Sequence, residues 1–299
     1  MTAALQALLV TLLWSSTFIV TKWIFEIGGV GPLWLNALRF AMAALVLLGW
    51  RTARRRPSWR AEFAGKGLLL PVIGLGVANF AIAQGGVTLG LHLLPSTHVS
   101  LILSLNNTLQ VILFGALLLR EWPSAIQSAG LLVGLGGAAL FYWPVASPPG
   151  GWWGALPVII TGVAYGLVTI YTRKFMRAGA IGAMALTEVA MAAGAVTMAV
   201  VAYAVEGLPQ LTAVTFGYLL LLAVVNTAFT FPLWAHTQKV LAPFETSTLN
   251  NTMLVQIALL AWLLLGESLG LQKVIAILVV TAGTLLVQVG PHLAGRWRS

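Results

Sequence analysis

Apolar stretches of about 20 residues recur along the whole chain and limit what it can fold into. As a helix, such a stretch crosses a hydrocarbon layer of roughly 30 Å, where irregular backbone exposed to lipid is not tolerated. Hydrophobic residues make up 59% of the 299 residues and charged residues 8%, which excludes a water-soluble globule. The sequence predicts an all-α membrane protein with ten transmembrane helices, at residues 3–25, 32–50, 67–90, 96–119, 124–143, 152–172, 180–203, 214–238, 243–265 and 271–289.

The basic residues predict how these helices are oriented. Cytoplasmic loops of membrane proteins carry an excess of lysine and arginine. Here the bases concentrate in the loops on one predicted side, above all in "RTARRRPSWR" at residues 51–60. We therefore expect both termini in the cytoplasm, and interpret the net charge of +9 as an orientation signal beside anionic lipid headgroups, without a nucleic-acid partner.

Two halves of the chain correspond in order. Asn79 corresponds to Asn226, "NNT" occurs at 106–108 and 250–252, and "LLLRE" (117–121) corresponds to "LLLGE" (263–267). We predict a duplicated five-helix unit, residues 1–147 and 148–299. Because five spans are an odd number, the second unit enters the membrane in the opposite sense. Such an inverted repeat is typical of transporters that open one central site alternately to either side.

Several functional classes are disfavoured by residue content. The chain has no cysteine and no aspartate, and its seven glutamates lie mostly in loops or at helix edges. We expect no metal and no cofactor. The glycine-rich segments at 74–80 and 134–140 lie inside apolar spans, so they do not form phosphate- or dinucleotide-binding loops. An enzyme is therefore not expected, which leaves a transporter or a structural or receptor-like membrane protein.

Longer segments resemble a known family. These are "LLWSSTFIVTK" near the start, "LNALRFAMAALVLL" in the second span, and the repeat endings "ILFGALLLREWPSAIQSAGLLVGLGGAALF" and "ALLAWLLLGESLGLQKVIAILVVTAGTLLV". Over essentially its whole length the chain is similar to the drug/metabolite transporter superfamily, specifically its ten-helix exporters built from two EamA-type repeats. The resemblance implies that four helices of each half surround a central cavity while the fifth lies at the side. It looks most like bacterial inner-membrane exporters of aromatic and other neutral amino acids.

Polar and aromatic side chains inside the apolar spans are the candidates for a substrate site, because polar groups are costly in hydrocarbon. Trp14, Thr17 and Thr21 are spaced i, i+3 and i+7, so they share one face of the first helix. Asparagines in equivalent spans of the two halves serve equally as contacts between helices or with substrate. The predicted substrate-binding residues are Trp14, Ser16, Thr17, Thr21, Lys22, Arg39, Asn79, Asn106, Tyr165, Tyr171, Glu188, Asn226 and Asn250.

The three charged candidates have alternative roles. Lys22 lies close enough to the outer end of its span to reach the headgroups, so it is an interface anchor or a cavity residue. Arg39 lies deeper and is a substrate contact or a structural partner of helix carbonyls. Glu188 is the deepest acid and either pairs with a base or carries a proton.

The expected function is export of neutral, especially aromatic, amino acids by alternating access across a bacterial inner membrane. A phosphorylated solute would need several converging bases, and only Lys22 and Arg39 are candidates. The alternative is a multidrug or lipophilic-cation exporter coupled to a proton gradient, in which Glu188 is the acid. The expected partners are a small-molecule substrate and the lipid bilayer, with the chain a monomer or a homodimer. The glycines at 130, 134, 136 and 137 suit either packing within one chain or a dimer interface.

Overall fold

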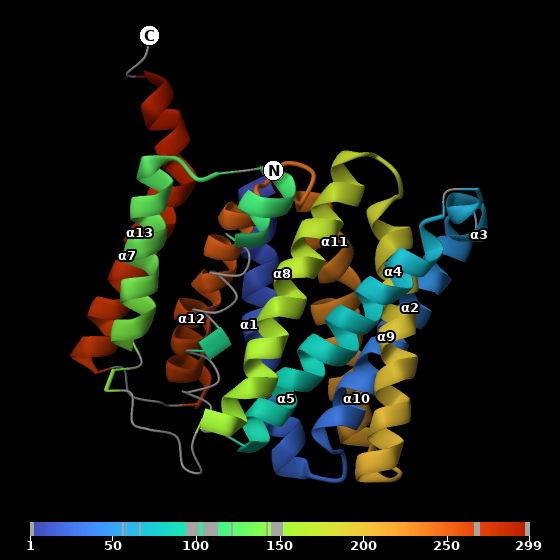
Figure 1. Cartoon of the computed structure of the whole chain (residues 1–299). Helices are drawn as coiled ribbons and strands as arrows, with labels where there is room; N and C mark the ends of the chain where they lie inside the picture. Colours follow the sequence, from blue (N-terminus) through green and yellow to red (C-terminus); the bar gives the residue numbers. More distant parts are fainter. Residues whose placement is uncertain are drawn as a thin grey trace.

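Long helices, roughly side by side, dominate the computed structural model (Figure 1). The structure describes residues 3–55, 57, 59–65, 67–93, 102–103, 113–120, 122–141, 143–144, 152–265 and 270–296, and no strand occurs among them. The main helices are α1 (Ala3–Ile27), α2 (Pro32–Ala53), α3 (Trp59–Phe63), α4 (Leu69–Gly76), α5 (Gln84–Leu93), α7 (Ala125–Phe141), α8 (Leu156–Arg177), α9 (Ala183–Glu206), α10 (Ala213–Ala223), α11 (Thr230–Thr237), α12 (Pro243–Leu265) and α13 (Leu271–Arg296).

Seven helical stretches in the described residues are long and apolar enough to cross a membrane. They correspond to the first, second, third and sixth to ninth predicted spans. Two shorter apolar helices, Ala125–Phe141 and Leu271–Val287, correspond to the fifth and tenth. The predicted fourth span, 96–119, lies largely outside the described residues. The all-helical membrane protein is confirmed for the described part, and the number of ten helices stays a prediction.

The loops that carry the basic residues lie on one side of the molecule. Both termini, the end of α2 and the loops from α8 to α9 and from α11 to α12 lie toward the top of Figure 1. This is the arrangement that the charge distribution predicts, and we refer to this side as the upper side.

The third and eighth predicted spans each contain a π-helical segment. In the first half η1 (Val77–Ala83) joins α4 to α5, and in the second half η3 (Val224–Phe229) joins α10 to α11. Each segment carries asparagine at its third position, Asn79 and Asn226. A π-helical turn widens the helix by one residue and often occurs at functional sites. Neither segment contains glycine or proline, so composition alone did not predict these turns.

Helices α2 and α9 pack together and are joined near both ends. At the lower end the Glu206 carboxylate accepts hydrogen bonds from the backbone N–H groups of Leu33 and Trp34, at 2.8 and 3.0 Å. These donors belong to the first turn of α2, which has no intrahelical partners for them and carries partial positive charge. At the upper end Arg51 of α2 pairs with Glu188 of α9 at 2.6 Å. The pair is thus fixed by polar contacts at both ends of an apolar contact surface.

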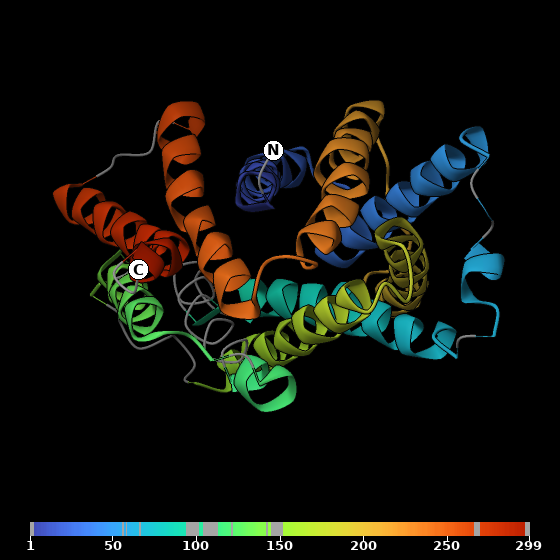
Figure 2. The same cartoon turned by 90° about the horizontal axis from the view of Figure 1, so that it is seen from above.

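Helices α7 and α13 form a separate pair at the side of the molecule, next to α12 (Figure 2). Gly130 and Gly137 of α7 lie against Gly283 and Val280 of α13, and a Cβ atom at Gly283 would lie 2.5 Å from the backbone nitrogen of Gly134. Absence of side chains thus allows close approach of the two backbones. The lateral position agrees with the placement that the family resemblance implies for the fifth helix of each half.

Candidate transport cavity

A cavity of about 640 Å³ lies between helices from both halves of the chain. Its described walls come mainly from α1, α2, η1, α8, α9, α11 and α12. The lining extends from Phe25 and Pro32, near the lower ends of α1 and α2, to Gln238 and Thr246, near the upper ends of α11 and α12. This volume is in the range of pockets that hold small organic molecules.

Seven of the predicted site residues line this cavity: Trp14, Thr17, Thr21, Arg39, Asn79, Tyr165 and Asn250. The stripe of α1 predicted from spacing is among them. Phe18 of the same helix also lines the cavity. Ser15 instead donates hydrogen bonds to the Thr11 carbonyl at 2.8 Å and to Gln256 Oε1 at 3.0 Å.

Four predicted residues are not part of the described lining, namely Ser16, Tyr171, Glu188 and Asn226. The Asn226 side chain is buried and donates hydrogen bonds to Ser16 Oγ at 2.8 Å and Thr17 Oγ1 at 3.1 Å, so it joins η3 to α1. Tyr171 is 40% exposed, and its ring lies beside that of Phe175. Glu188 pairs with Arg51. Asn106 and the side chain of Lys22 lie outside what the structure describes.

Sequence reasoning missed several uncharged polar residues of the lining. Helical spacing could have found some of them, because Asn36 precedes Arg39 by three positions and Ser247 precedes Asn250 by three. The missed polar residues are Asn36, Gln84, Thr169, Thr172, Thr187, Gln238, Thr246, Ser247 and Asn251.

Aromatic rings from both halves meet in the middle of the cavity. The centroids of Trp14 and Phe231 are 5.1 Å apart, those of Trp14 and Trp234 5.0 Å, and those of Phe80 and Phe231 5.0 Å. The Trp14 indole N–H donates a hydrogen bond to Thr230 Oγ1 at 2.9 Å, which fixes the ring. All four rings contribute to the cavity wall. They offer tilted aromatic faces to an apolar or aromatic group of a bound solute.

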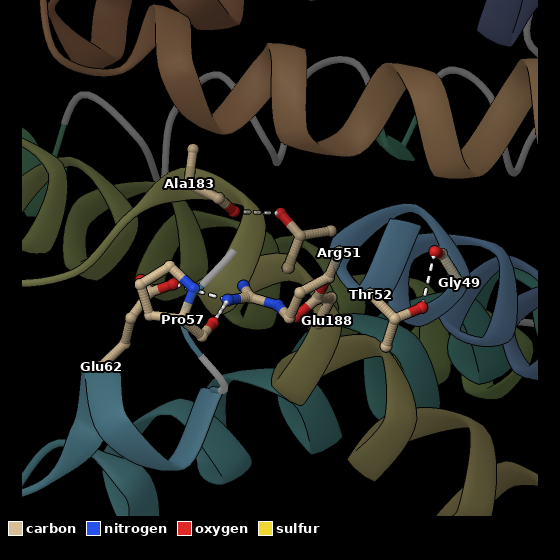
Figure 3. Close-up of polar contacts among 8 residues, drawn as sticks. Gly49, Arg51, Thr52, Pro57, Glu62, Ala183 and Glu188 are labelled. Carbon is tan, nitrogen blue, oxygen red and sulfur yellow. Dashed lines mark hydrogen bonds and ion pairs between the residues drawn. The ribbon is translucent and has the colours of Figure 1, made fainter. Parts of the chain in front are cut away.

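The described glutamates are engaged or located away from the cavity. Arg51 lies between Glu188 and Glu62, with 2.6 Å to each carboxylate, and also donates a hydrogen bond to the Pro57 carbonyl (Figure 3). Glu206 binds the start of α2, Glu245 accepts a hydrogen bond from the Ala242 N–H at 2.7 Å, and Glu26 is exposed near the end of α1. Among the described lining residues there is no acid, and Arg39 is the charged one.

Two amide side chains near the upper end have hydrogen-bonding capacity that the described residues do not meet. Gln238 is fully buried, and neither its Oε1 nor its Nε2 has a hydrogen-bond partner in the described part of the chain. The same holds for Asn250 Oδ1. An unmet buried polar group costs about 1–3 kcal/mol. A polar solute or water would lower that cost.

These features define a helical membrane protein with a central cavity suited to a small solute. A model of the EamA-like transporter family matches residues 1–143 and 152–289. The chain belongs to the EamA-like transporter family. It is therefore a membrane transporter of small molecules.

Two individual similarities agree in coverage. The chain is 28% identical over 265 residues to a Pseudomonas aeruginosa protein described as "Uncharacterized protein PA1977", which covers 84% of this chain and 82% of that protein. A solved structure described as "Crystal structure of protein" superimposes with a TM-score of 0.82 at 21% identity, over 96% of this chain and 97% of the other. The second similarity concerns the fold alone.

Proposed function

We propose that this protein exports neutral, especially aromatic, amino acids across the bacterial inner membrane by alternating access. The observation that carries the proposal is the lining of the cavity. Aromatic rings at its centre are combined with amides and hydroxyls along both ends, and no described lining residue is acidic. Rings bind an apolar or aromatic side chain, while amides and hydroxyls hydrogen-bond the polar end of a zwitterion.

The duplicated inverted arrangement, with units 1–147 and 148–299, is part of the same proposal. Three observations support it. The family model matches the chain twice, at 1–143 and 152–289. A π-helical turn with asparagine at its third position interrupts equivalent helices of the two halves. The basic loops and both termini lie on one side, which we propose to be cytoplasmic. In this proposal the transporter is a monomer or a homodimer of the chain.

The alternative, proton-coupled export of lipophilic cations, has less support. A cation needs a carboxylate near its path, and Glu188 was the candidate. Its carboxylate instead lies 2.6 Å from Arg51, and the residue is not part of the described cavity lining. The positive charge of Arg39 at the cavity wall further disfavours a cationic solute.

Counterflow in liposomes tests the proposed substrate class. Purified protein is reconstituted into vesicles loaded with unlabelled solute, and entry of labelled tryptophan, phenylalanine, threonine or a quaternary ammonium drug is followed without a pH gradient. We expect accumulation of tryptophan and phenylalanine, weaker accumulation of threonine, and none of the drug. Accumulation of the drug alone, or flux only after a pH gradient is imposed, would favour the alternative. Protein-free vesicles are the control.

A further inference from the structure

Arg39 is a buried guanidinium on the wall of the cavity without an acidic partner in the described part of the chain. It lies on α2 about 10 Å from the lower end of that helix, estimated at 1.5 Å per residue, and only 6% of it is exposed. A charge at such depth in a membrane protein is costly and commonly marks a functional contact. The acids described on α2's neighbours are engaged elsewhere: Glu188 pairs with Arg51, and Glu206 binds the start of α2.

Neutral groups of η3 hold one edge of this guanidinium. Arg39 Nε donates to Thr227 Oγ1 at 2.6 Å, and Nη2 donates to the Asn226 carbonyl at 3.3 Å. Thr227 in turn donates to the Leu222 carbonyl at 2.8 Å, which fixes the acceptor. The π-helical turn thus orients the arginine with hydrogen bonds that do not neutralise its charge.

The opposite edge of the fork carries Nη1 and the second Nη2 hydrogen. A guanidinium presents its donors in a rigid planar fork, and the edge formed by Nη1 and Nη2 matches the two oxygens of a carboxylate. Arg39 lines the cavity together with Asn36, three positions earlier on the same helix, and with Tyr165. A planar anion entering the cavity would therefore meet an oriented cation with two donors available.

We propose that Arg39 binds the carboxylate of the transported solute through its Nη1–Nη2 edge, so that the transporter selects solutes that carry a carboxylate. This assignment rests on the proposed function, because it names the group of an amino acid that the cavity recognises. It also makes a separate statement, since a carboxylate is required whether or not the solute carries an amino group. The aromatic rings of Trp14, Phe80 and Phe231 are then left to bind the apolar part.

Equilibrium binding of four indole compounds to the purified full-length protein tests the proposal. Tryptophan has carboxylate and ammonium, indole-3-propionate only carboxylate, tryptamine only ammonium, and tryptophanamide carries an amide in place of the carboxylate. We expect the wild type to bind the first two at least about 10-fold more tightly than the last two, the effect of losing a charge-assisted bidentate contact. Equal binding of all four would overturn the proposal.

Substitutions separate this contact from a structural role. Arg39→Gln is expected to weaken binding of the two carboxylate compounds about 10- to 100-fold and to leave binding of tryptamine unchanged. For Arg39→Lys we expect affinities between those of the wild type and Arg39→Gln, because lysine keeps the charge but lacks the planar fork of donors. The control is Arg54→Gln, an exposed arginine directly after the other end of the same helix. Equal weakening of all compounds by Arg39→Gln would contradict a carboxylate contact. If that variant does not fold, the wild-type series decides alone.

The proposed function and this assignment fail differently. Arg39-dependent binding of indole-3-propionate without binding of tryptophan would contradict an amino-acid substrate and support the carboxylate contact. Binding of tryptophan and tryptamine with equal affinity would support a transporter that binds indole compounds and would contradict the contact between Arg39 and a carboxylate. Absence of Arg39-dependent binding for both carboxylates would overturn the assignment.

Discussion

Replacing Gly76 by alanine is expected to prevent α4 from packing on α9 and to lower the free energy of unfolding by about 3 kcal/mol, at the upper end of the usual overpacking cost. A Cβ atom at Gly76 would lie 2.0 Å from the backbone carbonyl oxygen of Ala190 and 2.6 Å from its carbonyl carbon. These are backbone atoms of a long helix, so no side-chain rotation relieves the overlap. The helices must separate, which displaces Leu75 and Asn79 in the cavity wall.

Gly74→Ala is the matched control, because it lies on the same helix and a Cβ atom there would meet nothing within 4 Å. Both substitutions change helix propensity by the same amount. The difference between the stabilities of the two variants therefore reports the close approach of α4 to α9 at Gly76. The stability of both variants is measured as the melting temperature of the detergent-solubilised protein, followed by intrinsic fluorescence. Equal melting temperatures for the two variants would contradict the close contact between α4 and α9.

The substitution Arg51→Met is expected to destabilise the upper end of the α2–α9 pair by about 3 kcal/mol, because it takes the Arg51 cation away from the buried Glu188 carboxylate. Arg51 is 2% exposed and Glu188 6%, and their side chains are 2.6 Å apart. Glu62, also 2.6 Å from Arg51, has a side chain that is 25% exposed and can turn to water. We therefore expect most of the loss to come from Glu188.

A second substitution checks this assignment of the loss. The double variant Arg51→Met/Glu188→Met is expected to be more stable than Arg51→Met alone, because it also removes the buried negative charge and leaves an apolar contact. Lys174→Ala, at an exposed base near the same side of the molecule, is the control and should change the melting temperature little. A double variant no more stable than the single one would show that Glu188 does not account for the loss.

The helices could be predicted from the sequence because their length is set by the bilayer. For α9 the predicted span 180–203 compares with Ala183–Glu206, a difference of three residues at each end. The rotation of each helix about its axis was harder to predict. Asn226 lies inside its predicted span, yet its side chain contacts Ser16 and Thr17 of α1, and a π-helical turn changes which residues share a face.

The cavity could be predicted only where one helix supplied a clear pattern. Their spacing puts Trp14, Thr17 and Thr21 on one face of α1, and all three line the cavity. Glu188 was expected either to pair with a base or to carry a proton, but nothing in the sequence indicated that its partner is Arg51, 137 positions away. Gln238 directly follows α11, and Thr246 lies in the polar first turn of α12, where no apolar periodicity distinguishes a wall residue from a loop residue.

Alternating exposure of the two ends of the cavity is the most direct test of the account. The chain contains no cysteine, so an introduced cysteine is a unique label. Phe25→Cys marks the lower end of the cavity and Ser247→Cys the upper end. Each variant in liposomes is labelled with a charged thiol reagent, with and without tryptophan. Alternating access predicts that tryptophan changes the labelling rates at the two positions in opposite directions. Rates that rise together at both positions, or that do not respond to tryptophan, would contradict it.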